Sequence, residues 1–137
     1  MPLTTEPFCG RLPTEFGSLP KKEFMETIYC DGSLKYICCV HNNEITMLPV
    51  EDMSHNEAEY EAILLALDIA EGKEAIIYSD SQLAIRQING GYRVKYEKIR
   101  AKWSSVIKVR EHRAKKGLKT MFEWIPRGQN QAGLVLE

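Results

Sequence analysis

The chain has 137 residues, a length that suits one compact domain and is too short for two. Apolar residues make up 44% and charged residues 27%, which excludes a disordered, collagen-like or coiled-coil chain. No apolar run approaches the ~18 residues that a membrane span needs, so we expect no membrane partner. The first ten residues lack a basic start and an apolar stretch, which predicts a cytoplasmic location.

The net charge of −1 hides a segregation of charge along the chain. Residues 93–119 contain eleven Lys or Arg and two acids, whereas residues 1–92 contain six Lys or Arg and fifteen acids. A basic stretch beside an acidic body is typical of a protein that binds a polyanion, and the acidic part could hold cations. The alternative is an ordinary solvated helix face.

The first half of the chain predicts an arm followed by three strands. Residues 1–21 hold four of the six prolines, and we expect them to form an extended or mobile arm before a domain over residues 22–137. The predicted strands are residues 24–30, 34–41 and 45–50. Asp31-Gly32-Ser33 is a turn signal after the first strand, and Asn42-Asn43 suits a tight hairpin after the second. The three strands are therefore predicted to be antiparallel.

Helical periodicity begins at Ser54 and predicts a helix to about residue 73, with Ser54 or Asn56 as its cap and Gly72 at its end. A short strand at residues 74–79 and a helix at residues 81–89 follow. The remaining predicted elements are a basic amphipathic helix at 95–116, a strand at 119–125 and a last helix from residue 129. Three antiparallel strands followed by alternating helices and strands predict an α/β fold with a mixed sheet flanked by helices.

Three acids are candidates for a metal site. Asp31 and Asp80 each end a predicted strand, and ligands bind at the carboxyl ends of strands in sheets of this type. Glu59 lies in the first turns of the helix that follows the hairpin and could face the same edge. Three converging carboxylates would repel one another unless cations lay among them, and such oxygen ligands suit Mg²⁺ or Mn²⁺. Taken alone, the position of Asp80 before a helix favours a helix cap over a metal ligand.

Four segments, in their order and spacing, resemble ribonuclease H of type 1. They are YCDGS at residues 29–33, SHNEAEY at 54–60, YSDSQ at 78–82 and WIPRGQNQA at 124–132. The resemblance covers roughly residues 23–133 and is to the versions that lack the long basic handle insertion. It implies a ribonuclease H-like fold, with a five-stranded mixed sheet of three antiparallel and then two parallel strands. It also implies endonucleolytic hydrolysis of the RNA strand of RNA/DNA hybrids, and we expect the protein to be a monomer.

The resemblance implies roles for single residues as well. Asp31, Glu59 and Asp80 would be the catalytic ligands of two Mg²⁺ ions, with Mn²⁺ as a substitute and Asp31 as the bridge between them. Asn56 and Gln82 would touch the minor groove, where 2′-hydroxyl groups distinguish RNA from DNA. Their alternative roles are helix capping and surface hydrogen bonding. The residues expected to contact phosphates are Arg93, Lys95, Lys98, Lys102 and Arg127.

The sequence departs from this family at Gly133, where a fourth acid usually follows the alanine of the last segment. That acid usually helps to hold the cation that activates the attacking water, and glycine offers no side-chain ligand. Glu137, one helical turn later, is a candidate replacement. A terminal Leu-Glu also resembles a cloning remnant, which weakens that argument.

Because the fourth acid is missing, the sequence is compatible with several functions. The first is a nuclease weakened by the loss of one carboxylate, and the second is a module that binds nucleic acid without cleaving it. Transposases, integrases and exonucleases share the architecture with other substrates, but the SHNEAEY and SDSQ segments favour the hybrid-cleaving branch. A role unrelated to nucleic acid is the last alternative.

Overall fold

The computed structural model describes residues 25–137, so the arm predicted for residues 1–21 and the predicted start of the domain lie outside the described residues. The order of elements within residues 25–137 is the predicted one. The elements are β2 (Glu26–Gly32), β3 (Tyr36–His41), β4 (Glu44–Pro49), α2 (His55–Ile69), β5 (Ala75–Ser79), α3 (Gln82–Ile88), α4 (Glu97–Lys115), β6 (Thr120–Trp124), the short 3-10 helix η2 (Arg127–Gln129) and α5 (Gln131–Leu136).

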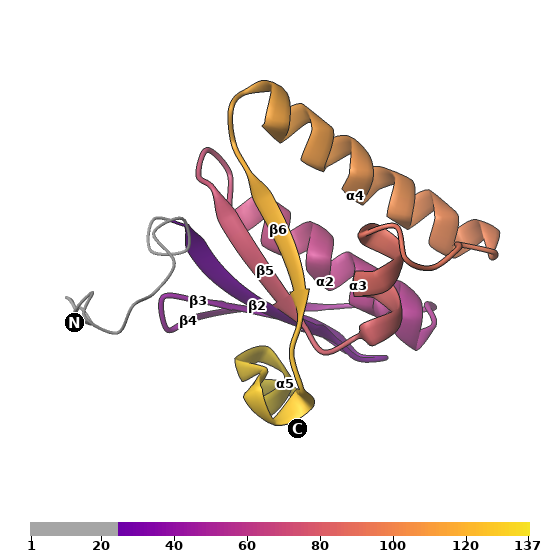
Figure 1. Ribbon diagram of the computed structural model, residues 1–137. Coiled ribbons are helices and arrows are strands. Elements are labelled where there is room, and N and C mark those ends of the chain that lie inside the picture. The colour runs from indigo at the N-terminus through magenta and orange to yellow at the C-terminus, as the bar shows by residue number, and fades with distance from the viewer. Residues whose placement is uncertain (1–24) are drawn as a thin grey trace.

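The five strands form one mixed sheet in the order β4-β3-β2-β5-β6 (Figure 1). β2, β3 and β4 pair antiparallel, while β5 is parallel to β2 and β6 is parallel to β5. This arrangement confirms the predicted fold class. Over residues 25–137, no helix combines the length and apolarity that crossing a bilayer requires.

The two hairpins differ in how closely they follow the prediction. Asn42 and Asn43 both have positive φ, at 52° and 65°, as a type I′ turn between β3 and β4 requires. The first strand runs further than predicted, because Asp31 pairs with Cys38 and Gly32 with Ile37. The turn therefore begins at Ser33 rather than at Asp31. Asp31 is consequently held rigidly by the sheet, one residue before the strand ends.

Side-chain caps fix the starts of α2 and α3. Ser54 accepts a hydrogen bond from the Glu57 backbone, and the Glu57 carboxylate accepts one from the Ser54 backbone, which completes a capping box. Ser81 caps α3 with a single bond, which its hydroxyl oxygen accepts from the backbone N–H of Ala84. α2 ends at Ile69, four residues earlier than predicted, and Gly72 lies beyond it with a φ of 76°.

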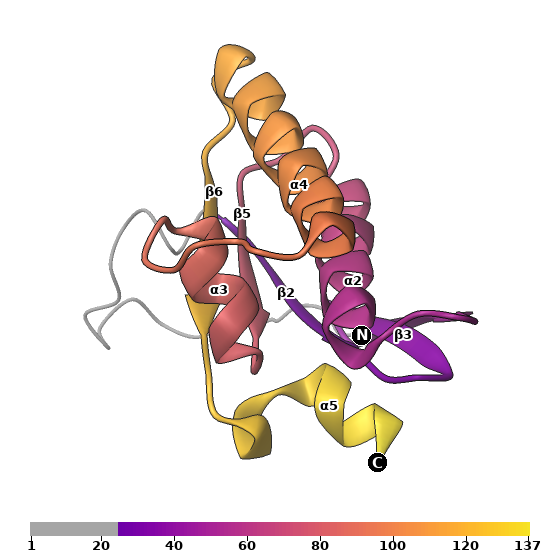
Figure 2. The same ribbon diagram turned by 90° about the vertical axis from the view of Figure 1, so that its right-hand side faces the viewer.

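The helices cover the two faces of the sheet unequally. α2, α3 and α4 lie together on one face, and α5 lies apart from them against β2 and β3 (Figure 2). Two adjacent cysteines of β3 lie on opposite faces of the sheet. Cys39 packs in the large core beneath α2, and Cys38 packs with Val40 of β3 and Ala132 of α5. The start of α2 and the start of α5 therefore flank the end of β2 from opposite sides.

Candidate active site

The three acids identified in the sequence come together at the carboxyl edge of the sheet. Asp31 is the penultimate residue of β2, and Asp80 directly follows β5, the strand that pairs with β2 in parallel. Glu59 reaches them from the second turn of α2. One oxygen from each of the three carboxylates lies within 4.8 Å of the others. This convergence is the one that the positions of the acids predicted.

Gly32 allows α2 to approach β2 closely enough for the acids to meet. A Cβ atom on Gly32 would overlap the backbone carbonyl of Ala58 and lie 2.8 Å from the backbone nitrogen of Glu59. The Gly32 N–H donates a hydrogen bond of 3.1 Å to Oε1 of Glu59. The glycine therefore permits the close approach and also orients the Glu59 carboxylate. Sequence analysis treated Gly32 only as a turn residue.

Two of the three acids are nearly inaccessible to solvent, and Asp80 is partly buried. Asp31 is 1% exposed and Glu59 is 4% exposed. Burial, followed by the charges of Asp31 and Asp80, raises the pKa of Glu59 to about 9. Burial and the Asp80 charge likewise raise the pKa of Asp31 above its usual value, and a side-chain hydrogen bond with Glu59 and the Arg127 charge offset part of this effect. The protein therefore brings these carboxyl groups together at an electrostatic cost that a bound cation would relieve.

One oxygen of the cluster has no hydrogen-bond donor. Oδ1 of Asp31 is fully buried, and no donor reaches it within the part of the chain that the structure describes. A buried carboxylate oxygen without a partner is costly. Oxygen-rich sites of this kind suit hard divalent cations such as Mg²⁺ or Mn²⁺. The geometry and the donor chemistry of the three acids thus fit one divalent cation.

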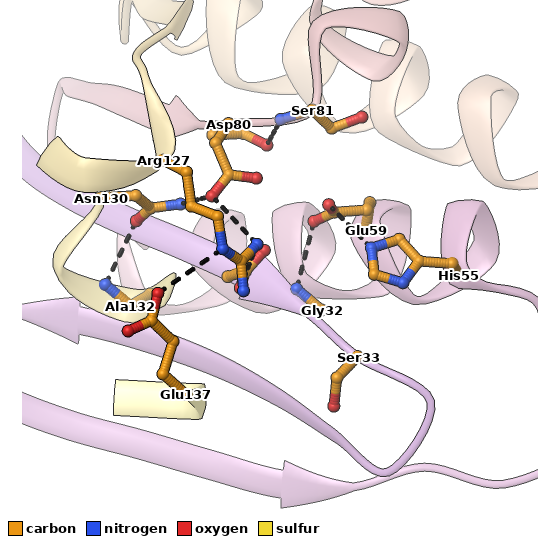
Figure 3. Close-up of polar contacts among 12 residues, drawn as sticks. Gly32, Ser33, His55, Glu59, Asp80, Ser81, Arg127, Asn130, Ala132 and Glu137 are labelled. Carbon is orange, nitrogen blue, oxygen red and sulfur yellow. Dashed lines mark hydrogen bonds and ion pairs between the residues drawn. The ribbon is translucent and has the colours of Figure 1, made fainter. Parts of the chain in front are cut away.

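Asn130 connects α5 to this cluster. Its Oδ1 accepts a hydrogen bond from the Ala132 backbone and so caps α5, while its Nδ2 donates to the Cys30 carbonyl at 3.0 Å and to Oδ2 of Asp80 at 3.1 Å (Figure 3). The side chain is completely buried. This role was not predicted, because the last helix was expected to begin at residue 129, although asparagine is a favoured N-cap residue.

Gly133 faces the carboxylates directly. A Cβ atom at this position would lie 3.2 Å from Oδ2 of Asp80 and 3.4 Å from Oδ2 of Asp31. A side chain here would therefore start inside the cluster, at the place where the resemblance expects a fourth acid. Glu137 does not take this place. Within residues 25–137 the group of potential metal ligands contains Asp31, Glu59 and Asp80 only.

Arg127 lies beside the cluster rather than among the basic residues of α4. Its Nη1 is 3.8 Å from Oδ2 of Asp80 and 4.0 Å from Oδ2 of Asp31 (Figure 3). Its Nε is 3.7 Å from Oε2 of Glu137, so Glu137 contacts the arginine and not the cluster. Sequence analysis placed Arg127 with the phosphate-binding residues and did not anticipate these ion pairs.

The predicted contacts to the minor groove lie at the starts of two helices beside the acids. Asn56 is in the first turn of α2 and Gln82 is the first residue of α3, and both side chains are exposed. Ser54 and Ser81 supply the helix caps. His55, which sequence analysis did not single out, extends from the start of α2, and its Nε2 lies 3.5 Å from Oε2 of Glu59.

The basic residues near α4 divide into two groups. Arg93, Lys95 and Lys98 are exposed, before the helix and in its first turn. Other basic side chains contact the protein itself: Lys102 pairs with Glu61 at 2.6 Å, and Arg113 is buried against the end of α2. The number of basic residues in segment 93–119 is therefore larger than the number whose side chains are free to contact a ligand from solvent.

Comparisons with known proteins agree with this geometry. A family model described as RNase H matches residues 23–131. LC11-RNase H1, solved in complex with an RNA/DNA hybrid, is similar with a TM-score of 0.69 and 24% identity, over 77% of this chain and 88% of that one. RNase H1 from the halophilic archaeon Halobacterium salinarum has a TM-score of 0.68 and 20% identity, over 82% of this chain and 93% of that one. The foamy viral protease-reverse transcriptase, also solved with an RNA/DNA hybrid, has a TM-score of 0.66 and 18% identity, over 95% of this chain and 21% of that one.

Proposed function

This chain belongs to the ribonuclease H family, and on that premise we propose that it is a metal-dependent endonuclease that cleaves the RNA strand of RNA/DNA hybrids. The observation that carries the proposal is the convergence of Asp31, Glu59 and Asp80, together with the buried Oδ1 of Asp31 that lacks a donor. The choice of substrate is supported by the two similar proteins that were solved with an RNA/DNA hybrid bound.

Asp31, Glu59 and Asp80 would hold the catalytic cation, which we propose to be Mg²⁺, with Mn²⁺ as a substitute. When bound, such a cation lowers the pKa of water and stabilises the charge that develops in phosphodiester hydrolysis. The neighbouring residues keep its ligands in place: the Gly32 N–H orients Glu59, and the Asn130 amide orients Asp80. Asp31 is fixed by its position within β2.

The hybrid would lie across the starts of α2 and α3, beside the acids. Asn56 and Gln82 are exposed there, and their amide groups can both donate and accept hydrogen bonds, as recognition of a 2′-hydroxyl requires. We propose that exposed basic residues hold the other strand by its phosphates, largely independently of base sequence. These are Arg93, Lys95 and Lys98. Lys102, which is paired with Glu61, would contribute less.

A second candidate function is a module that binds hybrids without cleaving them. Gly133 favours it, because a position that directly faces the Asp31 and Asp80 oxygens carries no ligand. Both candidates share the same binding surface. They differ only in whether three carboxylates suffice for hydrolysis.

Three labelled duplexes of one sequence test the proposed function: an RNA/DNA hybrid, a DNA duplex and an RNA duplex. Each is incubated with the protein in Mg²⁺, in Mn²⁺ and in EDTA. We expect internal cuts in the RNA strand of the hybrid alone, and none in EDTA. Binding of the hybrid without cuts would favour the second candidate, and equal cutting of the DNA duplex would overturn the assignment of the substrate.

A further inference from the structure

The carboxylate cluster has two unequal sides. On the α2 side, the Glu59 oxygens are contacted by the Gly32 N–H and by His55. On the α5 side, Oδ2 of Asp31 and Oδ2 of Asp80 both face Gly133 and the Arg127 guanidinium. Glu59 extends from α2, whereas Arg127 belongs to η2, just before α5 (Figure 3). The two sides therefore offer different environments to a positive charge.

The α5 side already holds a positive charge. A guanidinium stays protonated at any working pH, and this one lies within 4.0 Å of two carboxylate oxygens. Among the ion pairs within residues 25–137, Arg127 is the only cationic side chain that contacts Asp31 or Asp80. Asn130 also donates to the same Asp80 oxygen. These oxygens are therefore already partly satisfied.

A second divalent cation would be disfavoured on this side. It would share the two Oδ2 atoms with a guanidinium of like charge, and Gly133 would add no carboxylate to compensate. The other oxygens of the cluster differ, because the buried Oδ1 of Asp31 has no donor and no basic side chain other than His55 contacts Glu59 among the described residues. The α2 side of the cluster therefore suits a divalent cation, whereas the α5 side is already next to the charge of the guanidinium.

We propose that the chain holds a single divalent cation at Asp31, Glu59 and Asp80, and that the Arg127 guanidinium takes the place of the second cation that the resemblance to ribonuclease H implies. This inference rests on the proposed metal-dependent function. It makes Arg127 a positioning residue, which neutralises the α5 side of the cluster and limits the number of cations that the site takes up.

Binding of Mn²⁺, measured by the loss of its free-ion resonance signal and by calorimetry, tests the proposal without any cleavage assay. The parent protein should bind one equivalent. Arg127→Ala should bind Mn²⁺ roughly tenfold more tightly at low salt, because a charge that repels the cation is gone. Arg127→Ala combined with Gly133→Asp should bind two equivalents. Arg86→Ala, which removes an exposed arginine that stacks on Tyr92, is the matched control and should behave like the parent.

Each result has a defined meaning. Two equivalents in the parent, or unchanged or weaker affinity in Arg127→Ala, would overturn the single-cation site while leaving metal-dependent cleavage intact. One equivalent in the double variant would overturn it as well, since the α5 side would then lack a second cation for another reason. No Mn²⁺ binding by any variant would remove the proposed function together with this inference.

Discussion

The point at which a side chain on Gly133 would begin lies 3.2 Å from Oδ2 of Asp80. Gly133 therefore borders the acidic cluster and adds no charge to it. A fourth acid at this position would enter a site in which burial and like charges already raise the pKa of Asp31 and Glu59. Charge at position 133 should consequently affect both stability and cation binding.

Replacing Gly133 with aspartate should destabilise the cation-free protein relative to Gly133→Asn, which has nearly the same shape without the charge. We expect a difference on the order of 1 kcal/mol in the free energy of unfolding, measured by urea denaturation in EDTA. Mn²⁺ should remove the difference, because it neutralises the added carboxylate. Equal stabilities of the two variants in EDTA would show that a charge at position 133 does not interact with the carboxylates of the cluster.

Asp31→Asn should abolish Mn²⁺ binding and stabilise the cation-free protein. The raised pKa of Asp31 means that its ionised form is disfavoured in the folded state, so a neutral side chain of the same size removes this penalty. We expect a gain of about 1 kcal/mol in EDTA, measured by urea denaturation. Asp68→Asn, at an exposed position of α2, is the control and should leave both quantities unchanged. A loss of stability in Asp31→Asn would contradict the electrostatic argument.

The stability of the cation-free protein should fall as the pH rises. The pKa of Glu59 is about 9 in the folded state and close to its ordinary value of 4.5 when unfolded. At pH values between 4.5 and 9, the folded state binds more protons than the unfolded state. The contribution of Glu59 to the free energy of unfolding is therefore complete below pH 4.5 and is lost as the pH rises toward 9. The raised pKa of Asp31 acts in the same direction.

Urea denaturation at several pH values across this window, in EDTA, checks the pH dependence. Glu59→Gln should make the profile flatter, because the largest titrating contribution is removed. Mg²⁺ should reduce the loss at high pH, where it replaces the displaced protons. A profile in EDTA that rises with pH in the parent protein would mean that the acids are not held in an unfavourable environment.

Much of the fold was predictable because it depends on local patterns. Alternation, helical periodicity and turn residues such as Asn42-Asn43 indicate each element and its order, and the order determines which strand ends share an edge. The positions of Asp31 and Asp80 after neighbouring parallel strands therefore predicted their convergence. The first strand ran past its predicted end because pairing with β3 overrode the turn signal at Asp31.

Other features of the site depend on contacts between distant segments, which periodicity cannot indicate. In the sequence Arg127 is one basic residue among many, and only the fold shows that it lies beside Asp80. Asn130 lies inside the helix predicted from residue 129, but in the structure it caps α5 and its amide donates to the Cys30 carbonyl across the sheet edge. Lys102 reads as a solvated cation, but Glu61 on a neighbouring helix pairs with it. A charge or an amide in a sequence does not identify its tertiary partner.

Gly32→Ala should separate β2 from α2 and weaken cation binding. The added Cβ atom would overlap the Ala58 carbonyl, and backbone can yield only by moving the helix away. We expect a loss of about 2 kcal/mol or more in the free energy of unfolding, and weaker Mn²⁺ binding. Gly91→Ala is the control, because its Cβ atom would meet its nearest neighbour at an ordinary 3.5 Å. Equal effects of the two substitutions would contradict the close-approach argument.

Replacing Arg93, Lys95 and Lys98 together with glutamine should weaken hybrid binding and reduce its salt dependence. Each lost phosphate contact should lower the slope of log affinity against log salt by roughly 0.7–0.9. Fluorescence anisotropy in EDTA, over a range of salt concentrations, measures both quantities without cleavage.

The matched control removes three exposed lysines near the other end of α4, at Lys115, Lys116 and Lys119. It changes the net charge by the same amount and should leave the slope nearly unchanged. The same decrease in both triple variants would mean that binding responds to total charge rather than to a surface beside the active site.

Cleavage of an end-labelled RNA/DNA hybrid by the parent protein and by Asp31→Asn, in Mg²⁺ and in EDTA, is the most direct test of metal-dependent hydrolysis at the Asp31, Glu59 and Asp80 cluster. We predict internal cuts in the RNA strand by the parent in Mg²⁺, no cuts in EDTA and none by Asp31→Asn in either condition. Equal cleavage by both proteins, or cleavage that persists in EDTA, would contradict catalysis at this cluster.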